Sequence, residues 1–136
     1  MTAFTARPLS DSTDSLLRFA MRADATLCAA AGLLVAMAAD PLSRLSGLSA
    51  TAEWLTGAGF VVYGAMLYLL AAVPDIRRVG VGVVAGNLVF SAAVLVVLVT
   101  GVLPLTAFGV GLTVAFTAAT LFLGYLQYLG VRRLPA

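Results

Sequence analysis

The chain has 136 residues, of which 62% are hydrophobic and 10% are charged, and its mean hydropathy is +1.07. A water-soluble domain is about 45–50% apolar and about 25% charged, so this chain lacks the polar surface that such a domain needs. Its net charge is +2, and its basic residues form no dense patch in the sequence. We therefore expect no nucleic acid among its partners. The composition predicts an integral membrane protein whose main contact is the lipid bilayer.

The residue types also restrict the chemistry. The chain has no histidine, and its basic residues are all arginines. Since Cys28 is the single cysteine, one chain cannot assemble a metal site of nitrogen and sulfur ligands or an internal disulfide. Without histidine or lysine, a serine or threonine nucleophile has no ordinary general base. We therefore expect no enzyme activity, no cofactor and no metal, and we interpret Cys28 as a small buried hydrophobe.

The first predicted helix, residues 12–39, has the weakest apolar pattern of four. Its uncharged part, 25–39, is too short to cross a bilayer core of about 30 Å, so the span must include Arg18 and Arg22. Capping residues favour a helix start here, and Asp14 precedes Arg18 and Arg22 at four-residue spacing, which is an acid-to-base ladder along one face. The candidate caps lie in the segment Ser10-Asp11-Ser12-Thr13-Asp14.

A secretory signal peptide is the alternative interpretation of this segment. Arg18 and Arg22 would then precede an apolar core, and Ala36-Met37-Ala38 would provide a small-residue cleavage site. The acidic residues around position 14 fit the positively charged start of a signal peptide poorly. We therefore favour a retained membrane span.

Three further apolar runs predict helices over residues 52–73, 78–100 and 105–130, each long enough to cross a bilayer. Prolines mark the connections between them, because proline does not continue a helix. The longest connection contains the segment 41–45, which we expect to lie along the membrane interface, and Ser49 or Thr51 as a cap for the second span. The sequence thus predicts an all-α bundle of four transmembrane helices, forming one domain over residues 1–136.

The arginines predict the orientation of the bundle. If four helices alternate in direction, one arginine, Arg44, falls on one side and the other seven fall on the opposite side. By the positive-inside rule, the side with seven arginines is cytoplasmic, so both termini form short cytoplasmic tails in a plasma (inner) membrane. Three spans would split this set, which supports counting the weak first helix. The seven are Arg7, Arg18, Arg22, Arg77, Arg78, Arg132 and Arg133.

Polar residues at membrane depth are candidates for function because they are costly in lipid. Asp24 is the only acid near membrane depth, on a face of small residues. Asn87 and Ser91 share a face of the third helix, and Gln127 ends a stripe of polar and small residues on the fourth. We predict that these four side chains form a buried cluster. It either binds a proton or a lipid head group, or it only fixes helix register through interhelical hydrogen bonds.

Glycines and arginines provide two further candidate surfaces. Gly57 and Gly64 lie on the second span, and Gly82 and Gly86 form a G-x-x-x-G pair on the third. Such glycines permit close backbone approach, either within the bundle or to a partner. Arginines near the cytoplasmic ends could contact anionic lipids or only anchor the helices. These arginines are Arg18, Arg22, Arg77 and Arg78.

Several short motifs together carry a resemblance to a known family: Leu17-Arg18-Phe19-Ala20-Met21-Arg22-Ala23-Asp24-Ala25, Gly32, Leu45-Ser46-Gly47-Leu48, Gly86-Asn87-Leu88-Val89-Phe90-Ser91, Gly101, Leu105-Thr106 and Leu126-Gln127-Tyr128. From Leu16 onward the chain resembles a family of small four-span integral membrane proteins of actinobacteria, mycobacteria included. Leu88 and Val102 replace aromatic residues that are typical of the family. The resemblance implies a four-helix bundle with cytoplasmic termini, and a possible role as the accessory subunit of Mce-type lipid-import complexes of the mycobacterial envelope.

Two functional hypotheses follow. The first is a noncatalytic accessory or stabilising subunit that docks against a larger membrane-protein partner. The second is a small proton-coupled transporter of lipophilic compounds that works as a homodimer, with Asp24 exchanging a proton for a lipophilic cation. An enzyme acting on lipids is the least favoured, since the sequence offers no acid/base pair.

Overall fold

The computed structural model describes residues 13–135, and every regular element in that range is a helix. Four helices are long and apolar enough to cross a membrane, and one is short. The predicted all-α bundle of four spans is confirmed, and the chain is a multi-pass membrane protein. The helices are α2 (Ser15–Met37), α3 (Ala39–Ser46), α4 (Ala50–Leu70), α5 (Ile76–Thr100) and α6 (Ala107–Arg132).

The observed ends of the four spans lie within three residues of the predicted ends. Ser49 caps α4 by accepting a hydrogen bond from the backbone N–H of Ala52 at 3.1 Å, as predicted. Asp14 precedes α2 but makes no side-chain capping bond; its carboxylate instead accepts a hydrogen bond from Nε of Arg18 at 3.1 Å. Three of the other proposed caps and one counted arginine lie outside the described residues: Ser10, Asp11, Ser12 and Arg7.

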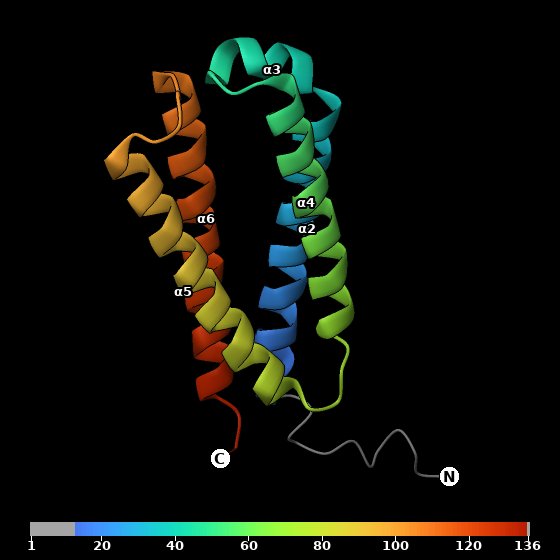
Figure 1. Cartoon of the computed structure of the whole chain (residues 1–136). Coiled ribbons are helices and arrows are strands. Elements are labelled where there is room, and N and C mark those ends of the chain that lie inside the picture. Colours follow the sequence, from blue (N-terminus) through green and yellow to red (C-terminus); the bar gives the residue numbers. More distant parts are fainter. Residues whose placement is uncertain (1–12, 136) are drawn as a thin grey trace.

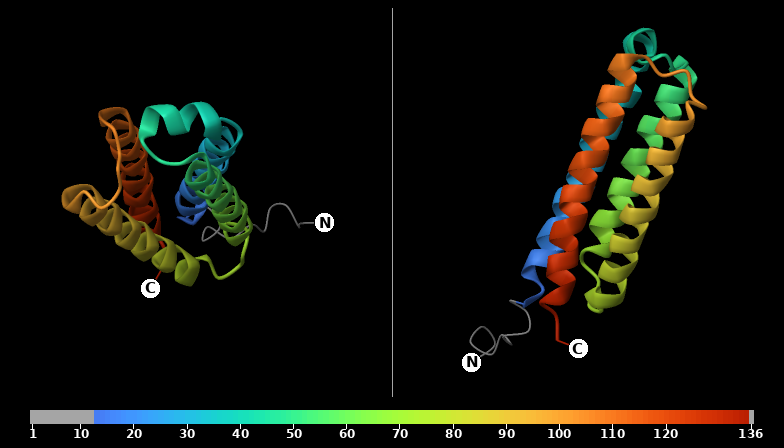
Figure 2. Two further views of the ribbon diagram at one scale, coloured as in Figure 1. Left: turned by 45° about the horizontal axis from the view of Figure 1, so that its top comes forward. Right: turned by 90° about the vertical axis from the view of Figure 1, so that its left-hand side faces the viewer.

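The spans pack as two pairs, α2 with α4 and α5 with α6 (Figure 1), and α2 also packs along α6. The start of α2, the end of α6 and the α4–α5 turn lie together at one end of the bundle, called here the terminal end. Helix α3 lies across the opposite end, called the α3 end (Figure 2). Although α4 and α5 are consecutive in the chain, they contact each other little. Helix α2 therefore packs against both α4 and α6, whereas α4 and α5 are only loosely packed against each other.

The short helix α3 is fixed at its C-terminal end by polar contacts to two spans. The hydroxyl of Ser46 donates to the carboxylate of Glu53 on α4, and both side chains are buried. The carbonyl oxygen of Ser46 accepts from the backbone N–H of Thr106 at 2.9 Å, just before α6. Gly47 follows with a φ of +89°, and a Cβ atom there would lie 2.1 Å from the Pro104 carbonyl oxygen. Only glycine combines this backbone conformation with so close a neighbour.

Small residues bring the backbones of α2 and α4 into direct contact. A Cβ atom at Gly57 would lie 2.4 Å from the carbonyl oxygen of Gly32 and 2.5 Å from the N atom of Ala36. One at Gly64 would lie 2.6 Å from the carbonyl oxygen of Ala25. Close approach of this kind supplies the van der Waals contact that holds helices together in lipid, where the hydrophobic effect between them is absent. It also explains why α2 and α4 form the tightest pair.

The substitution Gly57→Ala is therefore expected to destabilise the fold, because the added methyl group overlaps the α2 backbone. We expect a loss of about 1–3 kcal/mol in the free energy of unfolding, measured from the helical circular dichroism in mixed micelles as the fraction of denaturing detergent rises. Gly59→Ala on the same helix is the control. A Cβ atom there meets nothing within 4 Å, so it should be neutral or stabilising by up to about 1 kcal/mol. Equal midpoints for the two variants would contradict the close packing.

Candidate functional site

Three polar side chains from three helices meet inside the bundle. Gln127 on α6 donates from Nε2 to Oδ2 of Asp24 on α2 at 2.8 Å. Asn87 on α5 donates from Nδ2 to the same oxygen at 3.3 Å and to Oε1 of Gln127 at 2.7 Å. Asp24 and Gln127 are fully buried, and Asn87 is 4% exposed. The structure thus joins three of the four predicted members, called here the Asp24 cluster, in the half of the bundle toward the terminal end.

The fourth predicted member, Ser91, shares the buried face of α5 with Asn87 but does not join the Asp24 cluster. Its hydroxyl group is buried and has no hydrogen-bond partner among the described residues. Cys28 contacts the cluster instead, since its Sγ lies 3.5 Å from Oδ1 of Asp24. The thiol is buried in the bundle, as a small hydrophobe is expected to be, and also faces the carboxyl group.

The carboxyl group of Asp24 has no arginine partner in the described part of the chain. Arg22, two residues earlier, is exposed, and Arg18 bonds to Asp14 and to backbone carbonyls of the α4–α5 turn. A charged carboxylate is costly to bury without a cation, and two amide N–H groups offset part of that cost. Chemically, this group can hold a proton, or it can attract a cation that enters from elsewhere.

A cavity of about 410 Å³ adjoins the Asp24 cluster, in the space where α4 and α5 fail to close. Asn87 and Cys28, two of the three side chains that hydrogen-bond to Asp24, form part of its wall. Leu55, Gly59 and Gly86 also line it and are exposed, so the cavity opens sideways toward the lipid. Its remaining wall is largely aromatic and hydroxylic: Thr56, Phe60, Tyr63, Phe90, Phe116 and Thr120.

One buried hydroxyl group in the cavity wall lacks a hydrogen-bond partner among the described residues. Thr113 and Thr117, earlier on α6, each donate to a backbone carbonyl oxygen of their own helix at 2.8 Å. The Thr120 side chain is 3% exposed, yet its Oγ1 makes no hydrogen bond with the described residues. Buried polar atoms are usually satisfied, and an exception calls for a physical explanation such as a ligand or water. One residue of the predicted polar stripe of α6 thus lies beside a cavity, which periodicity alone does not reveal.

The four glycines that the sequence grouped as a packing or partner surface separate into two kinds. Gly57 and Gly64 are buried against the α2 backbone and serve packing within the chain. Gly82 and Gly86 are exposed, and a Cβ atom at either meets nothing within 4 Å. The G-x-x-x-G pair of α5 therefore packs on no helix among the described residues and faces outward, with Gly86 also at the mouth of the cavity.

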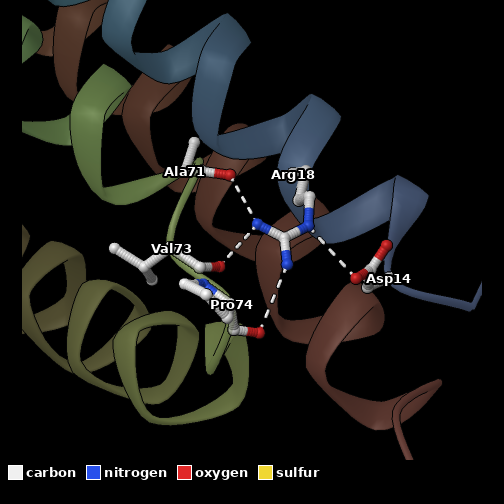
Figure 3. A network of polar contacts seen from close by, with 5 residues as sticks. All are labelled: Asp14, Arg18, Ala71, Val73 and Pro74. Carbon is white, nitrogen blue, oxygen red and sulfur yellow. Dashed lines mark hydrogen bonds and ion pairs between the residues drawn. The ribbon is translucent and has the colours of Figure 1, made fainter. Parts of the chain in front are cut away.

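The four arginines proposed as lipid contacts also differ in their surroundings. Arg18 donates from Nη1 to the carbonyl oxygens of Ala71 and Val73, both at 2.8 Å, and from Nη2 to that of Pro74 at 3.4 Å (Figure 3). It thereby binds the carbonyl of the C-cap residue of α4, Ala71, and two carbonyls of the turn that follows. The other three arginines are exposed: Arg22, Arg77 and Arg78. Of these, Arg77 donates from Nη1 to the carbonyl oxygen of Pro135 at 3.3 Å, and Nε of Arg78 lies 3.8 Å from Oδ2 of Asp75.

Comparisons with protein-family models, with curated proteins and with solved structures give no match to this chain. Its function is therefore inferred from its own geometry. The features that distinguish it are the buried Asp24 cluster, the cavity between α4 and α5, and the outward glycines of α5.

The substitution Arg18→Lys is expected to destabilise the protein even though it keeps the positive charge. A lysine ammonium is a single point donor and cannot reproduce the planar fork that binds two carbonyls and a carboxylate at once. We expect a loss of about 1.5–3 kcal/mol, measured as above by unfolding in mixed micelles. Arg22→Lys, on an exposed side chain of the same helix, serves as the control and should leave the midpoint unchanged. A fully stable Arg18→Lys variant would show that the fork is dispensable.

Proposed function

We propose that the protein is a noncatalytic accessory or stabilising subunit of a larger membrane complex. The observation that supports this role best is the outward face of α5. Gly82 and Gly86 leave a strip of this span without side chains and without neighbours within 4 Å. A helix of a partner protein can approach such a strip closely, and close approach drives helix association in membranes.

The small size of the loops agrees with this role. The connections between the long helices contain little besides α3 and short turns, so the described residues offer a partner mainly the lipid-facing helix surfaces. The complex that we propose is a lipid-import system of the bacterial cell envelope, following the resemblance of the chain to small actinobacterial membrane proteins. The arginine pattern further supports a location in the plasma membrane with the terminal end facing the cytoplasm.

Replacing Gly82 by leucine should release the partner, because the new side chain fills the space that a partner helix would occupy. The measurement is co-purification of a tagged chain from native membranes in mild detergent, with mass spectrometry of the bound proteins. The wild-type chain should retain a stoichiometric large partner, and Gly82→Leu should retain about tenfold less, which corresponds to about 1.4 kcal/mol.

Gly111→Leu is the matched control, since Gly111 is an exposed glycine of α6 that also has nothing within 4 Å of its Cβ position. It should keep the partner. Recovery of the wild-type chain only as an isolated monomer would disprove the accessory role, and equal loss in both variants would remove α5 as the docking face.

A second function, a small proton-coupled transporter of lipophilic compounds working as a homodimer, is favoured by one specific observation. The carboxyl group of Asp24 is fully buried without a cation among the described residues, and its neighbours Cys28 and Asn87 line an open cavity. Intramembrane acids with this placement are typical of proton relays. Under this hypothesis, a proton and a substrate alternate at the Asp24 cluster.

The transporter hypothesis predicts that Asp24→Asn abolishes export of a lipophilic substrate driven by a pH gradient across proteoliposomes. The amide has nearly the same shape but cannot release a proton at ordinary pH. Asp75→Asn, at an exposed acid of the α4–α5 turn, should leave the export rate unchanged. Unaltered export by the Asp24→Asn variant would reject proton coupling at this residue.

A further inference from the structure

The cavity between α4 and α5 has a wall of aromatic rings from three different helices. The ring of Phe60 on α4 lies 4.8 Å from that of Phe116 on α6 and 6.1 Å from that of Phe90 on α5, measured between centroids. All three residues line the cavity. Aromatic faces carry negative charge density and attract cations at distances up to about 6 Å. This wall is suited to an apolar guest, and more so to one that carries positive charge.

The carboxylate of Asp24, behind the inner wall, also favours a cation. Asn87 and Cys28 separate the cavity from Asp24 by a single layer of side chains, and the lining contains no arginine among residues 13–135. In a medium of low dielectric constant, the attraction between unlike charges persists over such a distance. Among the described residues, the titratable groups in the wall itself are Cys28 on α2 and Tyr63 on α4, while α5 and α6 contribute uncharged residues.

The cavity is also large enough for a small organic ion. The volume of about 410 Å³ lies within the range of about 300–1,000 Å³ usual for small-molecule sites.

We infer that this cavity is an equilibrium binding site for lipophilic cations, meaning monovalent ions whose charge is shielded by aromatic or alkyl groups. Such ions partition into the bilayer and reach the site through the exposed residues at its mouth, among them Gly59 and Gly86. The site requires neither a partner subunit nor transport, so it goes beyond the accessory role. If the protein is also the proton-coupled transporter described above, lipophilic cations are its substrate class.

The test uses purified full-length protein in lipid nanodiscs with tetraphenylphosphonium as the probe. Tetraphenylborate has nearly the same size and the opposite charge, and empty nanodiscs measure partition into lipid. We expect saturable binding of tetraphenylphosphonium at one site per chain, and only background partition of tetraphenylborate. Two results would overturn the inference: equal saturable binding of the two ions to the protein, or no tetraphenylphosphonium binding above that of empty nanodiscs.

Two glycines one turn apart on α5 provide matched variants. Gly86 lines the cavity and Gly82 does not, while a Cβ atom at either meets nothing within 4 Å. Gly86→Leu places a side chain at the mouth of the cavity and should weaken tetraphenylphosphonium binding about tenfold or more. Gly82→Leu should leave it unchanged. Identical binding by the two variants would place the ion outside this cavity and refute the assignment.

The contribution of charge is tested with Asp24→Asn, which should weaken tetraphenylphosphonium binding about tenfold without creating affinity for tetraphenylborate. The wild-type comparison of the two ions and the Gly86→Leu variant keep the inference testable if this variant does not fold. Loss of partner co-purification in Gly82→Leu with normal ion binding would support the accessory role and the site independently. If the accessory role is disproved, the cation-binding site still stands, and the reverse also holds.

Discussion

The direct contact between the backbones of α2 and α4 is the constraint on which the rest of the bundle depends. Lipid tails surround both helices, so association requires close van der Waals contact rather than expulsion of water. Gly32 and Gly57 allow that contact by leaving no side chain between the helices. Helix α4 packs on α2 and α5 packs on α6, while α4 and α5 contact each other little. The cavity lies between these two helix pairs.

Polar groups then determine how α6 and α5 are placed on the same central helix. The carboxyl group of Asp24 accepts from both Asn87 and Gln127, and this shared acceptor fixes the rotation of the two helices that carry them. At the terminal end, Arg18 binds the carbonyls that follow α4 (Figure 3), which fixes the turn into α5. Asp24 and Arg18, both on α2, thereby join segments that lie far apart in the chain. Hydrogen bonds of this kind are individually modest in membranes, at about 0.6 kcal/mol on average, so their main effect here is on geometry.

The sequence predicted much of this arrangement because its strongest signals are periodic. Apolar runs marked the spans, and the spacing of polar residues on α5 and α6 predicted that Asn87 and Gln127 face inward. A pattern within one helix does not state which neighbour occupies that face. For this reason the G-x-x-x-G motif of Gly82 and Gly86 looked equivalent to Gly57 and Gly64, although within residues 13–135 only Gly57 and Gly64 pack against another helix.

Other features could not be read from the sequence because they depend on pairs of distant residues. Arg18 resembles any arginine near a membrane surface until the carbonyl groups 53 to 56 residues later are placed beside it. The buried contact between Ser46 and Glu53 depends on the turn after α3 in the same way. Phe60, Phe90 and Phe116 sit among other apolar residues, and nothing local distinguishes a ring that lines a cavity from one that faces lipid.

The separation of the Asp24 cluster along the chain also affects how the protein is made. The two amide donors to Asp24 come from residues 63 and 103 positions later. A membrane protein is synthesised and inserted from its N-terminus, so α2 enters the bilayer before either donor exists. An acidic residue at the centre of a span costs about 2.5–3.5 kcal/mol during insertion. The first span thus holds an acid without its amide partners while the rest of the chain is synthesised, and its buried hydrogen bonds are complete only after α6 has been inserted.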